Sequence, residues 1–232
     1  MEFFDSLIAY CRGLLEDLPV KRYTFNSAEK WDDIGYNQVI MQRDAAFEIS
    51  GTGVSLVTSS DICEGVSVIG DDLESIHSER KFARISFIQI KEQKDEQTAY
   101  NLIRKIEYVK YHFFPEGYML RSSSRSHKEA VRVSKKAIKN GISFEKVGNL
   151  LIEKYKQIPG VEKVSVVFVT EQSFDYSLMQ SVAEKNNSIT ETLNHVMNNV
   201  VFDCESCKLK PVCDEVEGMK ELHFKTAMGK KG

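Results

Sequence analysis

The sequence predicts an α+β fold with a mixed, largely antiparallel sheet, packed helices and a C-terminal cysteine-bearing tail. In the first half of the chain, short alternating apolar segments follow one another with only turn residues between them, as in β-hairpins. In the second half, segments with helical spacing separate the strands. This order favours α+β over a doubly wound parallel sheet. We expect one α+β domain over residues 1–200 and a metal-binding tail over 201–232.

An amphipathic helix is expected first, at residues 2–18, because apolar side chains recur there three and four positions apart before Pro19. A strand is expected at 20–25. Residues 37–51 and 54–59 then predict two strands joined by a turn at Gly51–Gly53.

A short strand flanked by turn residues is expected at 64–72. In residues 81–91 the two sets of alternating side chains differ enough in polarity to predict a half-buried strand. Strands are also expected at 118–123, at 200–203 and at 162–170, which is the most apolar and should be central. Helices are expected at 95–113, 127–141, 143–160, 173–187 and 189–199. Ser126 and Ser143 are the expected N-caps of the second and third of these helices, and Gly141 should end the second.

Composition excludes several classes of protein. The apolar fraction of 42% and charged fraction of 28% are ordinary for a globular protein, and the net charge of −3 is not that of a nucleic-acid binder. No apolar run approaches the roughly 20 residues that span a bilayer. Acidic residues in the first helix argue against a signal peptide, so we expect a cytoplasmic protein without membrane partners.

Three of the five cysteines lie close together in "FDCESCKLKPVCDEVEG", residues 202–218. Cys204 and Cys207 form a Cys-x2-Cys pair whose sulfurs can converge on one metal, and the spacer with Pro211 can return Cys213 to the same centre. The intervening lysines favour thiolates. This clustering predicts a metal site in a reducing compartment rather than disulfides.

The fourth ligand of such a site is open. His223 would complete a Cys3His zinc site, and nearby carboxylates such as Asp203 and Asp214 are other donors. Alternatively, a [4Fe–4S] cluster would leave one iron for an exogenous or partner ligand. Three thiols without metal in a loop are the plain alternative.

A basic stretch covers residues 120–139. Arg121 and Arg125 lie in a serine-rich loop before the helix expected at 127–141, and Arg132 shares a face of that helix with three lysines. Loop arginines beside a helix N-terminus form an anion site suited to phosphates, although a solvated helix face fits equally well. The sequence has no Gly-rich phosphate loop, G-x-S-x-G or H-E-x-x-H motif, so it names no catalytic residue.

Several stretches together resemble one family, the acetyl-CoA synthase (beta) subunit of the carbon monoxide dehydrogenase/acetyl-CoA synthase complex. The strongest likeness is "VRVSKKAIKNGISFEKVGNLLIEKYKQIPGVEKVSVVFVT", supported by "VSVIGDDLESI" upstream and "VVFDCESC" downstream. The resemblance runs from about Tyr36 to Cys213 and lies in the order and spacing of these stretches. The chain is therefore similar to a short, stand-alone relative covering the central domain and first cluster cysteines.

The resemblance implies a coenzyme A-binding central domain, with Arg121, Arg125 and Arg132 as the binding residues. It also implies that Cys204, Cys207 and Cys213 match the first three cysteines of a [4Fe–4S] cluster bridged to nickel. The expected partners are carbon monoxide dehydrogenase-type, corrinoid or methyltransferase proteins of one-carbon metabolism.

The departures from the family bear on catalysis. The third cysteine follows sooner than in the family, no cysteine follows Cys213, and the Cys-Gly-Cys that chelates nickel is missing. The family's activity is CO-methylating acetyl-CoA synthesis, an acyl transfer, but the chain is not expected to be a complete catalyst. The alternative function is a non-catalytic interaction or regulatory module holding a structural zinc with His223.

Overall fold

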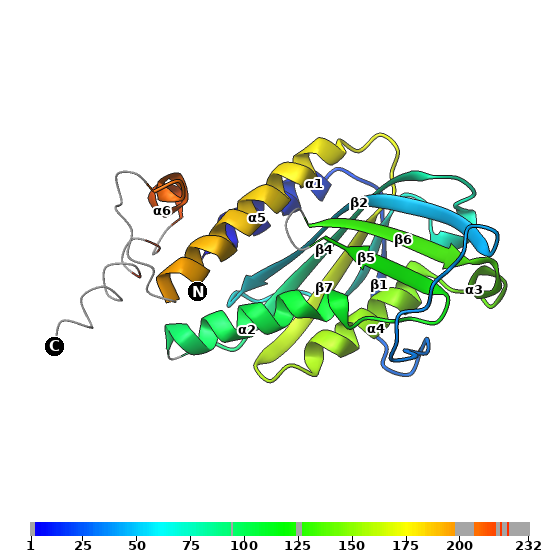
Figure 1. Cartoon of the computed structure of the whole chain (residues 1–232), viewed down its shortest axis with the longest axis horizontal. Helices are drawn as coiled ribbons and strands as arrows, with labels where there is room; N and C mark the ends of the chain where they lie inside the picture. The colour runs from blue at the N-terminus through cyan, green and yellow to red at the C-terminus, as the bar shows by residue number, and fades with distance from the viewer. Residues whose placement is uncertain are drawn as a thin grey trace.

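The computed structural model describes residues 3–93, 95–123, 127–197 and 207–216, together with Met219 and Leu222. Within these residues, seven strands form one sheet in the order β1-β3-β7-β4-β2-β6-β5 (Figure 1). The strands are β1 Val20–Thr24, β2 Ala45–Thr58, β3 Gly65–Ile69, β4 Arg80–Ile90, β5 Tyr118–Ser122, β6 Lys128–Ser134 and β7 Val161–Val169. The pairs β2–β4 and β3–β7 are parallel and the other four are antiparallel. The predicted α+β class is confirmed.

Helices cover both faces of this sheet. They are α1 Asp5–Leu15, α2 Glu96–Tyr108, α3 Lys135–Lys139, α4 Phe144–Lys156, α5 Tyr176–Met197 and α6 Lys210–Glu215, with 3-10 turns η1 Leu73–Ser75 and η2 Val109–Tyr111. Along β2, Ser55 hydrogen-bonds Tyr155 of α4, whereas Thr58 donates to Asp5 of α1. Because side chains alternate along a strand, α4 and α1 lie on opposite faces. The long helix α5 contacts α1 and β2, so it lies on the face of α1 (Figure 1).

The core is continuous from the sheet into α4. Phe144 of α4 stacks on Phe168 of β7 with ring centroids 4.5 Å apart, and Phe82 of β4 completes an aromatic trio. The Ser143 hydroxyl accepts from the Lys146 N–H and caps α4 as predicted. No helix among the described residues is long and apolar enough to cross a bilayer.

The turn expected at Gly51–Gly53 is wrong, because β2 runs through both glycines as one strand, and residues 37–44 precede it outside any strand. A Cβ at Gly51 would lie 1.6 Å from the Phe82 carbonyl oxygen, and one at Gly53 would lie 1.9 Å from the Glu129 carboxyl carbon. These glycines therefore permit close approach of a neighbouring strand and side chain rather than a change of direction.

The helix expected at 127–141 is also wrong. Residues 128–134 form β6, which pairs antiparallel with β2 and β5, and Ser134 caps the short helix α3 by accepting from the Ala137 N–H. Glu129, Val131 and Val133 are buried in alternation, a period of two that the charged residues between them obscure in the sequence. The proposed cap Ser126 lies outside the described residues.

Two smaller corrections concern burial and continuity. The strand β4 is buried on both faces rather than half-buried, because β2 and β7 flank it and helices cover it. The two helices expected at 173–199 are the single helix α5, whose buried stripe continues from Met179 through Val182 and Ile189 to Val196. No Pro or Gly interrupts it. The strand expected at 200–203 and the domain boundary near residue 200 lie outside the described residues.

Candidate functional site

The cysteine segment is described in part. Cys204 and His223 lie outside the described residues. Cys207 precedes α6, and its carbonyl oxygen accepts from the Lys210 N–H at 3.1 Å. Cys213 lies on α6, half-buried against the core. Among the residues that the structure describes, no three His, Cys, Asp or Glu side chains are grouped as metal ligands, so the predicted ligand set stays a prediction.

Two of the predicted arginines, Arg121 and Arg132, lie on neighbouring strands and point to the same face of the sheet, because Arg121 pairs with Ala130 and Arg132 is two residues further along β6. Arg132 lies on β6, where it forms an ion pair with Glu48 of β2 and donates to the Ile40 carbonyl at 3.3 Å. It is on a strand, so the helix face that it was expected to share with lysines does not exist. Arg125 lies outside the described residues. Arg121 is exposed on β5.

The strand register places Arg121 of β5 in one row with Lys81 of β4, with β6 and β2 between them. Arg121 pairs with Ala130 of β6, Ala130 with Ser50 of β2, and Ser50 with Lys81 of β4. Cross-strand partners point to the same face of a sheet, so these four positions form a row across it. With strands about 4.8 Å apart, the Cα atoms of Lys81 and Arg121 are separated by about 14 Å.

This row forms the floor of a hollow of about 710 Å³ on the α5 face of the sheet. Lys128 adds a third cation beside the row, because its register partner is Thr52 of β2. The first turns of α5 provide the opposite wall through Tyr176, Ser177 and Gln180. We call Lys81, Arg121, Lys128 and these walls the basic hollow.

The three cations of the basic hollow are exposed, and none of them forms an ion pair with a described carboxylate. Asp175, at the start of α5, accepts hydrogen bonds from the amide and hydroxyl of Ser177. These bonds, and more weakly the charge of Lys81, lower the pKa of Asp175. The hollow therefore combines three cations that have no ion-pair partner among the described carboxylates with several serines, a combination suited to phosphate oxygens.

Beneath the basic hollow, on the other face of the sheet, lies a buried ion pair that sequence reasoning missed. Arg84 Nη2 lies 2.5 Å from the Glu129 carboxylate, and Arg84 Nε donates to its second oxygen at 3.0 Å. Burial acts to lower the pKa of Arg84, but the charge and hydrogen bonds of Glu129 raise it above its ordinary value. Ser86 Oγ accepts at 2.7 Å and helps satisfy the guanidinium. The sequence signal was an arginine between the apolar residues Ala83 and Ile85, inside a strand.

A model of the family described as the CO dehydrogenase/acetyl-CoA synthase complex beta subunit matches residues 36–174, more than half of the chain. The chain belongs to this family. The predicted resemblance is thereby confirmed, and the match begins at the residue where the motifs placed it. No curated protein matches the chain.

The matched region of this acetyl-CoA synthase relative contains every strand from β2 to β7, and therefore all three cations of the basic hollow. It ends at Phe174, before α5 and before the cysteines. The floor of the hollow is thus part of the family's domain, whereas its α5 wall and the predicted metal ligands lie beyond the matched residues.

Proposed function

We propose that this member of the acetyl-CoA synthase family binds the phosphates of coenzyme A in the basic hollow. In this proposal it serves one-carbon metabolism beside carbon monoxide dehydrogenase-type, corrinoid or methyltransferase proteins, and is not by itself a complete catalyst of acetyl-CoA synthesis. The observation that carries the proposal is the row from Lys81 to Arg121, with Lys128 beside it, whose cations have no ion-pair partner among the described residues.

The shape of the row suits a ligand with several phosphates. Coenzyme A has a diphosphate and a separate phosphate on its ribose, so its negative charge is spread along its length. A span of about 14 Å allows Lys81 and Arg121 to engage different phosphates at once. Arg121 offers a planar fork of donors, and each lysine a mobile ammonium.

We propose for Arg132 a role different from the one predicted. Its charge is compensated by Glu48, so we assign it to holding β6 against β2 rather than to coenzyme A. Lys81 takes its place in the site. No local sequence pattern pointed to Lys81, because only strand pairing brings it near Arg121.

The test is calorimetric titration of the full chain with coenzyme A. We expect binding that weakens with salt, and a loss of roughly tenfold or more in affinity in Arg121→Gln and in Lys128→Gln, since each removes a charge-assisted hydrogen bond. Lys139→Gln on α3 is the matched control, because it removes the same charge from an exposed side chain away from the hollow, and its affinity should stay within about twofold. Absence of binding, or equal losses in all three variants, would refute the proposal.

We propose in addition that Cys204, Cys207 and Cys213 hold a [4Fe–4S] cluster. Thiolates suit iron–sulfur clusters and zinc alike, and Lys208 and Lys210 lie between the second and third cysteines, where their charge favours thiolates. When bound, such a cluster would supply an iron with an open position for a partner ligand. The competing proposal is a structural zinc with His223 as fourth ligand, in an interaction or regulatory module.

Metal analysis after anaerobic purification separates the two. A brown protein with about four irons per chain, lost in Cys207→Ser, supports the cluster. A colourless protein with one zinc per chain, lost in His223→Ala, supports the zinc module. Cys63→Ser is the control for both outcomes, because Cys63 is exposed and distant in sequence from the motif.

A further inference from the structure

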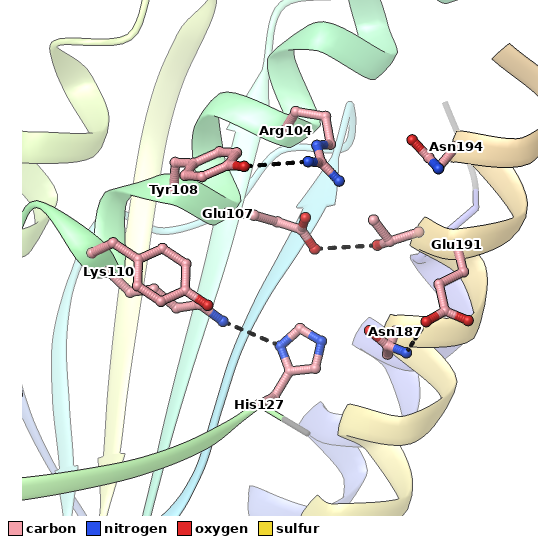
Figure 2. Close-up of a pocket in the computed structure, with 10 residues that line it drawn as sticks. Arg104, Glu107, Tyr108, Lys110, His127, Asn187, Glu191 and Asn194 are labelled. Atoms are coloured by element: carbon pink, nitrogen blue, oxygen red, sulfur yellow. Dashed lines mark hydrogen bonds between the residues drawn. The ribbon is translucent and has the colours of Figure 1, made fainter. Parts of the chain in front are cut away.

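A second cavity, of about 450 Å³, lies between α2 and α5, and it shares no lining residue with the basic hollow. Figure 2 shows polar side chains pointing into it from both helices and from the segments around η2 and before β6. The lining residues are Arg104, Glu107, Tyr108, Lys110, Tyr111, His127, Asn187, Thr190, Glu191 and Asn194. Its size falls within the usual range for small-molecule sites.

Two basic groups that line this cavity are buried. His127 is 4% exposed and Lys110 is 8% exposed, and Lys110 Nζ lies 3.4 Å from His127 Nδ1. Neither Lys110 nor His127 lies within ion-pair distance of a described carboxylate. Burying a charged ammonium in this way is costly unless a partner compensates it.

The contact between Lys110 and His127 determines which ring nitrogen of His127 carries the hydrogen. An ammonium only donates, so Nδ1 of His127 must accept from Lys110, and a neutral ring then has its hydrogen on Nε2. That Nε2 is buried and makes no hydrogen bond of normal geometry to a described residue. In Figure 2 it is directed across the cavity toward the side of Asn187. Burial, and next the charge of Lys110, lower the pKa of His127 to about 4, which keeps the ring neutral.

The backbone holds His127 in an unusual conformation. Its φ is +48°, in the left-handed region that only a few per cent of non-glycine residues adopt, chiefly Asn, Asp and His. The Gly53 N–H donates to the His127 carbonyl at 2.8 Å and helps maintain it. Strain of this kind persists where the surrounding structure imposes it, and here it aims a buried ring into a cavity.

The acidic groups of the cavity are already engaged. Thr190 Oγ1 donates to Glu107 at 3.3 Å, and Asn187 Nδ2 donates to Glu191 at 3.0 Å. The Asn187 side chain beside His127 has only the smallest influence on the pKa of the ring, and Nε2 has no described partner of good geometry, so these buried donors can take an acceptor from elsewhere. These two carboxylates, Glu107 on α2 and Glu191 on α5, disfavour a multiply charged anion such as phosphate, whereas a singly charged carboxylate meets less repulsion.

We propose that this cavity binds a small monocarboxylate, whose oxygens accept from His127 Nε2–H and from the Lys110 ammonium. The hydroxyls and amides of the walls, among them Thr190 and Asn187, suit a second polar group on the same ligand. This site is distinct from the coenzyme A site proposed above and does not depend on it.

Lactate is the probe, with lactamide as its uncharged counterpart and inorganic phosphate as a multiply charged competitor. The full chain is labelled with 15N-histidine, and the ring signals of His127 are followed in NMR titrations. We expect saturable shifts with lactate, at least roughly tenfold weaker binding of lactamide, and no competition by phosphate. Equal binding of lactamide, displacement by phosphate, or shifts that do not saturate would each overturn the proposal.

Two variants localise the effect. Lys110→Met keeps the length of the side chain but removes the ammonium, and His127→Asn keeps a residue tolerant of positive φ but removes Nε2–H. Each should weaken lactate binding roughly tenfold or more, followed in the variants by backbone amide shifts. Lys105→Met, an exposed position on α2, is the matched control and should bind lactate within about twofold of the wild type. Unchanged binding in both cavity variants, each confirmed as folded by its amide spectrum, would overturn the assignment.

Discussion

Two neighbouring residues of β6 show how differently this protein treats charge on the two faces of its sheet. Lys128 is exposed on the α5 face, at the basic hollow, without an ion pair to a described carboxylate. Glu129, the next residue, points to the α4 face, where it is 1% exposed and paired with Arg84. The alternation of side chains along a strand separates them by the full thickness of the sheet.

This difference in burial separates a charge that stabilises the fold from a charge that can bind a ligand. A buried ion costs several kcal/mol of desolvation, so it persists only with a partner of good geometry, and Glu129 has one in Arg84. An exposed cation has no such requirement, so Lys128 remains available to a ligand. On this basis we assign the Arg84–Glu129 pair to the fold and the basic hollow to binding.

The largest expected effect comes from breaking the buried pair. Glu129→Ala should lower the free energy of unfolding by about 3–5 kcal/mol, because it leaves the Arg84 guanidinium buried without a counter-charge. Urea denaturation measures this. Glu48→Ala is the control, since it removes a carboxylate from the half-exposed Arg132 pair and should cost about 1 kcal/mol or less. If the two variants lost similar amounts of unfolding free energy, the buried pair would not differ from the half-exposed pair, and the comparison of the two faces would be wrong.

The second largest expected loss of stability comes from Gly53 of β2, whose missing side chain leaves room for the Glu129 carboxylate. Gly53→Ala should lower the free energy of unfolding by roughly 2–3 kcal/mol, since the new Cβ would overlap the Glu129 carboxylate and displace it from Arg84. In a Glu129→Ala background the cost should shrink, which a double-mutant cycle in urea would show. Gly13→Ala on α1 is the control; nothing lies within 4 Å of its Cβ, so it should stabilise by roughly 0.5–1 kcal/mol.

Acid should act on a third buried group, His127, in the cavity between α2 and α5. Its pKa falls from an ordinary 6.5 to about 4 on folding, so the unfolded chain binds more protons between these values. The stability contributed by the neutral ring is therefore present above about pH 6.5 and is lost as the pH falls toward 4, by up to about 3 kcal/mol. The difference in unfolding free energy between pH 7 and about pH 4.5 should be smaller in His127→Asn than in the wild type. His77→Gln, at an exposed position, should behave as the wild type does.

The smallest expected effect on stability is on the α5 face of the sheet, at the basic hollow. Lys128→Gln should change the free energy of unfolding by no more than about 0.5 kcal/mol, because the side chain is exposed and has no described ionic partner. The same variant is expected to lose coenzyme A affinity, as described above. A large loss of stability in urea would show that Lys128 is structural and would weaken the comparison of the two faces.

Local patterns in the sequence were sufficient to predict many of the helices and strands of this protein and its family. Apolar periodicity located α1, α2, α4 and most of the strands, because burial on one side leaves a period of 3.6 or 2 in the chain. The order and spacing of the motifs were enough to identify the family. Arg121 was named from the sequence as an anion-binding candidate, since a basic loop next to serines is visible locally, and it lines the basic hollow; its role there stays a prediction.

Other features depend on residues distant in the sequence, and only the tertiary structure decided them. Gly51 and Gly53 resemble a turn until Phe82 and Glu129 approach them from other strands. The segment from Lys128 to Ser134 is a strand because β2 and β5 supply hydrogen-bonding partners that its own residues do not indicate. The row from Lys81 to Arg121 exists only through the register of four strands. Strand pairing is a long-range interaction, so it assembles sites from residues that no local pattern connects.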